Sequence, residues 1–327
     1  KKKFKKHQKK FKDKKIKVFF SIKEALKKNK KKVHLTINGI SGFAGLEPSI
    51  DTIKHTKILA IANKESIICG WKFLKYELRK NNTKFIPLDS EHFSIWSLLK
   101  NEKKQNIKKI YLTASGGPFL NKKLNEIKNI KPEFALQHPN WNMGKKISID
   151  SATMMNKIFE VIEAIKIFEL GLNKFEILIH PKSYIHAIVH FNTGLTKLLA
   201  HETSMQVPIS NVLYLNYNSF PLRNNFDYEK LNGINFIKPS FKKFPLLKIL
   251  NYKFNNTYFE IIMVSINDYL VKKYLNNKIP YASIYEIMLK LLKNQYFIKY
   301  YNTRPNNINE IKSMVNKVNN YLNKYFE

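Results

Sequence analysis

The chain has 327 residues, enough for two or three domains, and 44% of them are hydrophobic, as in soluble globular proteins. Its sequence has no run of 18 apolar residues, which argues against a transmembrane helix and a membrane partner, and its single cysteine, Cys69, excludes an internal disulfide. The formal net charge of +34 would suit a basic nucleic-acid-binding protein. However, only three of the 58 basic residues are arginines, the residue that binds phosphates and bases bidentately. We therefore expect no specific nucleic-acid partner and attribute the charge to an AT-rich genome.

The first third of the chain alternates apolar stretches with helical patterns. This order is typical of a doubly wound, dinucleotide-binding α/β sheet. We expect strands at Val33–Asn38, Lys57–Ala62 and Lys84–Leu88, and helices at Leu46–His55 and Ser66–Lys80. The glycines after the first strand, Gly39, Gly42 and Gly45, have the spacing GxxGxxG instead of the GxGxxG fingerprint. They could bring the backbone close to a cofactor, and a plain tight turn is an equal alternative.

Polar residues follow the second and third of these strands. Open α/β sheets bind ligands at the carboxyl ends of their strands, where Ala62-Asn63-Lys64 and Asp89-Ser90-Glu91 stand. If the second segment is extended, Asp89 and Glu91 point the same way. With Glu160 they would offer the hard oxygen ligands that Mg²⁺ or Mn²⁺ prefers. The alternative is an ordinary surface loop.

The stretch from His138 to Glu160 joins a loop to a predicted helix that begins near Asp150–Ser151. On that helix Asn156, Lys157 and Glu160 share one side, and Ser151 would lie where helix N-termini favour anions. Ser115, in a Ser-Gly-Gly turn after the strand Ile107–Thr113, could also approach an anion. This pattern suits a phosphate beside a cation. A capped, solvated helix is the alternative.

The second half of the chain contains strand patterns and then helical ones. Three expected strands, at Phe175–His180, Tyr184–Phe191 and Leu195–His201, would form an antiparallel sheet, in which we interpret His186 and His190 as structural residues. Helices follow at Thr257–Leu275, Ser283–Lys293 and Ile308–Tyr325. The predicted fold class is thus α/β and α+β: a partial doubly wound sheet (residues 1–88), a central α+β catalytic domain (89–215), a linker (216–245) and a C-terminal helical bundle (246–327).

Five motifs occur together in this chain: ANKES (62–66), PLDSEH (87–92), LTASGGPF (112–119), HPNWNMGKKISIDSATMMNK (138–157) and ILIHPKSYIH (177–186). In order and spacing they resemble 1-deoxy-D-xylulose 5-phosphate reductoisomerase. The resemblance implies an NADPH-dependent oxidoreductase and isomerase that needs Mg²⁺ or Mn²⁺ and makes 2-C-methyl-D-erythritol 4-phosphate for isoprenoid biosynthesis. It also implies a homodimer.

The resemblance further implies roles for particular residues. Asp89, Glu91 and Glu160 would bind the metal, and Lys64, Glu91, Glu160 and His138 would be catalytic. The substrate would contact Ser90, Ser115, His138, Trp141, Ser151, Asn156 and Lys157. NADPH would lie near Gly39, Ala62, Asn63, Lys64 and Gly144. Trp141 and Met143 would belong to a flap that closes over the substrate.

The chain departs from the family pattern in three places. The GxTGSIG-type turn that binds NADPH phosphates is absent, so it either lies on a preceding segment or is lost. In the latter case the chain would be a sugar-phosphate-binding remnant without reductase activity. Ile158 stands where the family usually has glycine, and Asn267-Asp268 matches an Asn-Glu segment weakly. We expect a cytoplasmic protein of an AT-rich bacterium, or alternatively one of a plastid-type organelle.

Overall fold

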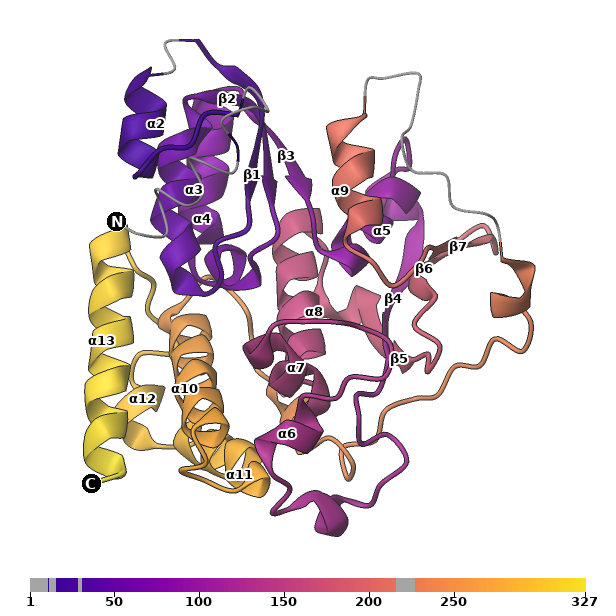
Figure 1. Ribbon diagram of the computed structural model, residues 1–327, viewed down its shortest axis with the longest axis vertical. Coiled ribbons are helices and arrows are strands. Elements are labelled where there is room, and N and C mark those ends of the chain that lie inside the picture. Colours follow the sequence, from indigo (N-terminus) through magenta and orange to yellow (C-terminus); the bar gives the residue numbers. More distant parts are fainter. Residues whose placement is uncertain (1–10, 12–15, 29–30, 216–226) are drawn as a thin grey trace.

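The computed structural model describes residues 11, 16–28, 31–215 and 227–327. Its N-terminal part is a three-stranded parallel sheet in the order β1-β2-β3, with helices on it (Figure 1). The elements are α2 (Ile22–Lys28), β1 (Val33–Asn38), α3 (Leu46–Ile53), β2 (Thr56–Ile61), α4 (Lys64–Lys80) and β3 (Lys84–Pro87). Asn38 pairs with Ile61, and Ile61 with Pro87, so all three strands end at one edge of the sheet. The predicted parallel sheet is confirmed.

The second sheet is mixed and has the order β5-β4-β6-β7. Its strands are β4 (Ile107–Ala114), β5 (Phe175–Ile179), β6 (Ile185–Phe191) and β7 (Thr196–Ala200), and α5 (Ser90–Leu98) lies against β6 and β7. The helix α9 (Gln206–Leu213) packs with α5 against the first sheet, where Val212 shares a small core with Ile58 and Ile86. The expected antiparallel pairing is confirmed for β6 and β7. The expectation that β5 joins them directly was wrong, because β4 lies between β5 and β6 and runs parallel to β5. Parallel neighbours need a long crossover, and here the chain between β4 and β5 supplies it with α6 (Pro132–Ala135), α7 (Lys145–Ala152) and α8 (Met155–Phe168).

Two short helices, not one, occupy the central stretch. The helix that was predicted to begin near Asp150–Ser151 begins at Lys145 instead, and α7 ends at Ala152. Met154 has a φ of 67°, a left-handed conformation that breaks the helix before α8 starts at Met155. Ser151 therefore lies in the last turn of α7, and the prediction that it marks a helix N-terminus was wrong. A non-glycine residue in this conformation is rare, so the pattern gave no warning.

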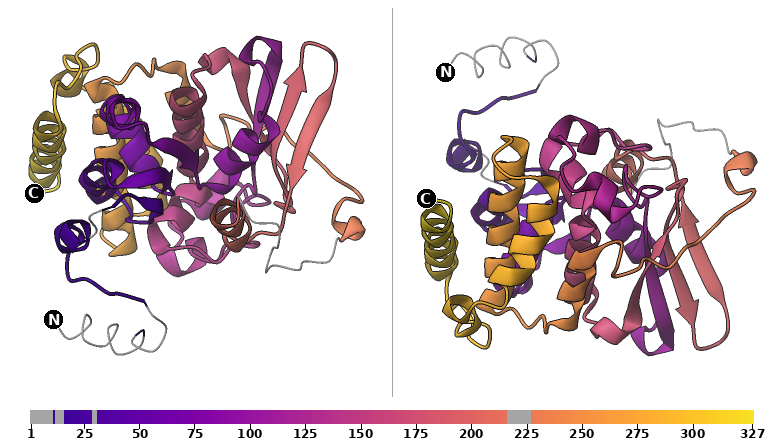
Figure 2. Two further views of the ribbon diagram at one scale, coloured as in Figure 1. Left: turned by 90° about the horizontal axis from the view of Figure 1, so that it is seen from above. Right: turned by 90° about the horizontal axis from the view of Figure 1, so that it is seen from below.

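The C-terminal helices pack against the N-terminal and central parts (Figure 2). They are α10 (Tyr258–Leu275), α11 (Tyr281–Leu291), α12 (Gln295–Ile298) and α13 (Ile308–Tyr325). The side chain of Thr257 caps α10, and Glu260 bonds back to the Thr257 N–H. Buried residues of α10, α8 and α4 belong to one hydrophobic core, which joins these parts firmly. No helix in the described part is both long enough and apolar enough to cross a membrane.

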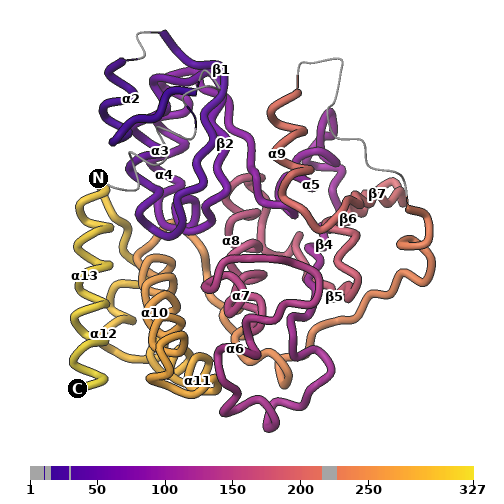
Figure 3. Tube along the Cα trace, viewed as in Figure 1, coloured from indigo at the N-terminus to yellow at the C-terminus, as the bar shows by residue number. Residues whose placement is uncertain are grey.

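The chain returns from the second sheet to the C-terminal helices over residues 227–251, a path that can be followed in Figure 3. Ile237 forms an antiparallel bridge with Ile179 of β5, and the ring of Phe236 lies 5.3 Å from that of His180. A run of 3-10 turns, Pro245–Asn251, then leads toward α10. Residues 216–226 of the expected linker lie outside the described residues.

Ile158 provides a test of the packing around α8. Its side chain is fully buried in the main core. Although the family pattern suggests glycine here, Ile158→Gly should lower the free energy of unfolding by about 3–5 kcal/mol, because it leaves a cavity and weakens the helix. Urea denaturation measures this loss, with Ile158→Val as a control that should cost about 1 kcal/mol. Equal stabilities of the glycine variant and the parent would contradict the packing described here.

Candidate active site

A cavity of about 330 Å³ lies between the first sheet, the second sheet and the α7–α8 junction. Every residue predicted for the site lines it except Gly39, Ala62 and Asn63, which stand at the edge of the first sheet. The lining residues among the predictions are Lys64, Asp89, Ser90, Glu91, Ser115, His138, Trp141, Gly144, Ser151, Asn156, Lys157 and Glu160. They come from the carboxyl ends of β3 and β4, the start of α4, the two central helices and the loop before α7. The structure thus brings together residues that are far apart in the sequence.

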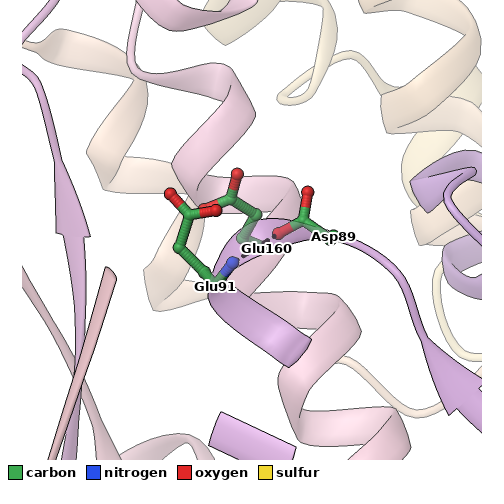
Figure 4. A group of neighbouring side chains, drawn as sticks. All are labelled: Asp89, Glu91 and Glu160. Carbon is green, nitrogen blue, oxygen red and sulfur yellow. Dashed lines mark hydrogen bonds between the residues drawn. The ribbon is translucent and has the colours of Figure 1, made fainter. Parts of the chain in front are cut away.

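Three carboxylates meet at the floor of this cavity (Figure 4). One oxygen from each of Asp89, Glu91 and Glu160 lies within 4.8 Å of the others, and no other such group of metal-binding side chains exists among the described residues. Asp89 caps α5 and accepts a hydrogen bond from the Glu91 N–H at 3.2 Å. The two acids converge because they flank a helix start, and not because the segment is extended, as the sequence analysis assumed.

Two buried ammonium groups hold these carboxylates together. Lys64 is in direct ionic contact with Asp89 and lies 3.5 Å from Glu160. Lys157 lies 2.7 Å from Glu91 and is in direct ionic contact with Glu160. Burial would raise the pKa of Asp89, but the Lys64 ammonium and His92 hold it well below its usual range. Burial and the nearby Glu91 carboxylate raise the pKa of Glu160 to about 7. The two lysines therefore offset only part of the repulsion among the carboxylates.

His92 supports the carboxylates from behind, a role that the sequence analysis missed. The ring is fully buried, with Nδ1 3.1 Å from Asp89 Oδ1 and Nε2 2.8 Å from the Glu160 carbonyl oxygen. Burial lowers the pKa of His92, but the carboxylates of Glu163 and Asp89 outweigh it and raise that pKa to about 9. Its position three residues after Asp89, on the same helix face, was the signal that could have identified it.

A second group of hydrogen bonds fixes the hydroxyl of Ser115. His138 Nδ1 accepts the N–H groups of Asn140 and Trp141 at 3.2 and 3.0 Å, so its proton is on Nε2, which lies 2.8 Å from Ser115 Oγ. Gly117 N–H also donates to Ser115 Oγ, at 3.0 Å. Ser115 thus accepts two hydrogen bonds and keeps its own proton for a ligand. Burial lowers the pKa of His138 to about 4, so this ring is neutral at ordinary pH.

Gly117 also explains how the Ser115 turn reaches α7. Its φ is +69°, and a Cβ on it would lie 3.1 Å from the Cα of Ala152. Only glycine allows this approach, which places the turn beside Ser151. Asn156 and Lys157 follow in the first turn of α8, and the Asn156 amide donates to Glu160 Oε1 at 2.6 Å. The helix start at the cavity is therefore that of α8, where the Met155 and Lys157 N–H groups donate to Thr153 Oγ1 and to the Met154 carbonyl oxygen.

The loop before α7 covers one side of the cavity. The Trp141 ring stands edge-on to His186, with centroids 5.9 Å apart, and His186 stacks on His201 at 3.7 Å. The amide of Asn140 donates to the Pro181 carbonyl and to Ser183 Oγ at 2.6 and 2.8 Å. Of these residues, the sequence analysis gave a role in the site only to Trp141, and it interpreted His186 as structural, although that ring lines the cavity. Ser183 and His186 stood in a motif that it quoted, whereas His201 and the lining residue Met205 carried no signal.

The sequence of this chain is similar to those of known proteins. Family models for 1-deoxy-D-xylulose 5-phosphate reductoisomerase match residues 1–70, and models for the C-terminal domain of that enzyme match residues 85–168 and 201–321. The reductoisomerase of Pelagibacter ubique is 52% identical over 303 residues, which are 92% of this chain and 78% of that protein. The enzyme of Wolbachia pipientis wMel is 41% identical over 260 residues, 78% of this chain and 67% of that protein.

Solved structures agree with these matches. The Zymomonas mobilis reductoisomerase in complex with NADPH has a TM-score of 0.82 at 30% identity, covering 94% of this chain and 79% of that one. A reductoisomerase in complex with NADPH, fosmidomycin and magnesium has a TM-score of 0.86 at 28% identity, covering 99% and 84%. With half of its residues identical to a relative that it matches over most of both lengths, the chain belongs to the 1-deoxy-D-xylulose 5-phosphate reductoisomerase family.

Proposed function

We propose that this chain converts 1-deoxy-D-xylulose 5-phosphate to 2-C-methyl-D-erythritol 4-phosphate, using NADPH and a divalent cation, in isoprenoid biosynthesis. The observation that carries the proposal is the single cavity in which three carboxylates face a cluster of hydroxyl, amide and ammonium groups. The first group suits a hard cation and the second suits a phosphate ester. A sugar phosphate with adjacent carbonyl and hydroxyl oxygens can engage both at once.

The carboxylate cluster fits the cation. Asp89, Glu91 and Glu160 offer oxygen ligands, and their mutual repulsion, which Lys64 and Lys157 offset only in part, would be relieved by a positive ion. A bound Mg²⁺ or Mn²⁺ supplies Lewis acidity toward the carbonyl and hydroxyl oxygens of the substrate. His92 fixes Asp89 through its ring and Glu160 through its carbonyl group, so the ligands are held in place before binding.

The hydroxyl, amide and ammonium groups that line the cavity beside the carboxylates fit the phosphate. Ser115 has a hydroxyl proton to donate, and Ser151 lies beside it at the end of α7. Asn156 and Lys157 begin α8, whose N-terminal dipole favours an anion. Neutral His138 orders both the Ser115 hydroxyl and the first turn of the covering loop. We infer that the loop with Trp141 and Met143 closes over the bound substrate and excludes water.

The edge of the first sheet fits part of NADPH. Gly39 and Gly42 have no atom within 4 Å of where a Cβ would stand, so a ligand can approach their backbone. Asn63 donates to the Gly42 carbonyl at 2.6 Å and shapes this loop. NADPH supplies the hydride that reduces the rearranged sugar. Lys64 begins α4 beside this edge and also reaches the carboxylates, so it can orient the substrate toward the cofactor.

The positions of these groups along the chain suggest separate binding domains. We propose that residues 1–88 bind NADPH and that residues 89–215 bind the metal and the substrate. Residues 216–245 would then link this part to the helical residues 246–327. The relatives named above are bacterial, which supports a place in the bacterial cytoplasm.

We also propose that the chain forms a homodimer through β7. This strand is at the edge of its sheet, and Leu195 and Leu198 are 65% and 48% exposed. An exposed edge strand with apolar side chains is normally covered by a partner. A second copy of the chain would provide the same edge and the same leucines.

Glu160→Gln tests the assignment of the metal ligands. Losing this carboxylate should lower turnover at least about 100-fold, since even residues behind metal ligands contribute 10- to 100-fold. The assay follows NADPH oxidation by absorbance with 1-deoxy-D-xylulose 5-phosphate and Mg²⁺. The exposed Glu133→Gln is the control and should keep full activity. An active Glu160→Gln enzyme would refute the metal assignment, and an inactive parent that still binds substrate by calorimetry would refute the reductase.

The affinity for the metal should depend on pH through Glu160. Because the pKa of Glu160 is about 7 without metal, this carboxyl is protonated below that pH and must lose its proton to bind a cation. The affinity for Mn²⁺ should therefore fall about tenfold for each pH unit below 7 and level off above it. Electron paramagnetic resonance of free Mn²⁺ measures this affinity. An affinity that does not change between pH 5.5 and 8 would contradict the raised pKa.

Leu198→Lys tests the proposed dimer interface. A charge at the centre of β7 should turn a dimer into a monomer, because it cannot be buried against a second copy without a partner. Sedimentation velocity measures the change. Tyr76→Lys, which alters a 63% exposed residue on α4, is the control and should leave the dimer intact. A monomeric parent, or a dimeric Leu198→Lys variant, would disprove this interface.

A further inference from the structure

Lys146 joins three separate parts of the molecule outside the cavity. Its ammonium nitrogen lies 2.7 Å from Glu65 of α4, 2.9 Å from Asp150 of its own helix α7, and 3.0 Å from Asp268 of α10. It also lies 5.3 Å from the centre of the buried Phe159 ring on α8. Four helices thus meet at one charged group. None of these five residues lines the cavity.

In the N-terminal and central parts, every residue that Lys146 contacts is next in the sequence to a residue that lines the cavity. Glu65 follows Lys64, whose ammonium group binds two of the carboxylates. Asp150 precedes Ser151, and Phe159 precedes Glu160. Adjacent residues on a helix move together. A displacement of Lys146 would therefore shift one cavity residue on each of the helices α4, α7 and α8.

The helix α10 holds this arrangement from outside. The fully buried Asn267 donates from its amide to Asp150 Oδ1 at 2.8 Å, while its neighbour Asp268 binds Lys146. These two residues form the Asn267-Asp268 pair that the sequence analysis could match only weakly. No residue of α10 lines the cavity. Through Asp150 and Lys146, α10 is bonded to residues that directly neighbour cavity residues in the sequence.

The charges at this point are poorly balanced for stability. Three carboxylates surround one ammonium group, and burial, together with Glu65 and Asp150, raises the pKa of Asp268 to about 7 despite Lys146. Removing one partner of a buried charge is costly when it leaves that charge unpaired. Replacing Asp268 does not, because Lys146 keeps Glu65 and Asp150 as partners. Asp268 can therefore be changed without great loss of stability, which allows its effect on the site to be measured separately.

We propose that Lys146 is a positioning residue that sets the placement of Lys64, Ser151 and Glu160 around the cavity. Asp268 of α10 holds it directly, and Asn267 of the same helix holds its partner Asp150. Lys146 stands two residues after Gly144, in the first turn of α7, so it also anchors the end of the covering loop. The C-terminal helices thereby act on a site that they do not touch. This inference rests on the proposed function for the identity of the substrate, but not for the binding of Mn²⁺.

The test is Asp268→Asn, which removes one clamp on Lys146 and one negative charge. Its melting temperature should stay within a few degrees of the parent. Its dissociation constant for 1-deoxy-D-xylulose 5-phosphate, measured by calorimetry with Mg²⁺, should rise about tenfold, since small displacements of positioning groups have effects of this size or larger. KM should rise with it, while kcat changes less. Asp268→Glu retains the carboxylate and should restore most of the affinity.

The control is Glu260→Gln. Glu260 and Lys166 form another buried ion pair, at 3.0 Å, which joins α10 to α8 but has no neighbour in the cavity. This variant should lower the melting temperature and leave substrate affinity unchanged. If it weakened binding as much as Asp268→Asn does, the effect would be one of general stability and the proposal would fail.

Mn²⁺ affinity, measured by electron paramagnetic resonance without substrate, separates this inference from the proposed function. A parent chain that does not bind the sugar phosphate would refute the proposed function alone. A threefold or greater loss of either substrate or Mn²⁺ affinity in Asp268→Asn, absent from Glu260→Gln, would support the role of Lys146. Unchanged affinities for both would overturn it.

Discussion

The site depends on keeping three carboxylates close together away from water. Such a group is unfavourable by itself, because burial penalises each charge and the charges repel one another. Lys64 and Lys157 each bridge two of the acids, and His92 links Asp89 to the backbone of Glu160. These partners come from α4, α8 and α5, so the electrostatic requirement ties three helices to one point. The hydrophobic core around α4 and α8 fixes these two helices, and with them the lysines that bind the carboxylates.

Much of this arrangement could be predicted from the sequence, for identifiable reasons. Strand and helix patterns in the first third are long and periodic, and parallel strands that end at one edge bring Lys64 and Asp89 together. The family motifs added the residues of the central stretch. What the patterns lacked was long-range pairing: β4, β5 and β6 each read locally as a strand, and nothing in their sequences indicates that β4 lies between the other two.

Other features escaped prediction because they depend on tertiary contacts. The break at Met154 requires a left-handed residue that no propensity favours, and it decides which helix offers its N-terminus to the cavity. His92 and Asn267 are polar residues whose partners lie 68 and 117 positions away in the chain. The sequence shows that both side chains can form hydrogen bonds, but it does not show which distant residues they bond to. Ile158, in contrast, fills the core where the motif suggested glycine, and the polar side of α8 is retained.

The crossover between β4 and β5 has a consequence for how the protein folds. Those strands are parallel neighbours, and the connection between them contains the covering loop, α7 and α8. Strand pairing across so long a connection closes a large loop, which is slow compared with the formation of helices or hairpins. Asp89 and Glu91 precede β4 and Glu160 lies within the connection, so the three carboxylates meet only after α8 has packed against α5, which joins residues as far apart as His92 and Glu160, 68 positions along the chain. The ligand-binding groups would thus be assembled late in folding, and nascent chains would gain no protection from metal or substrate until that step is complete.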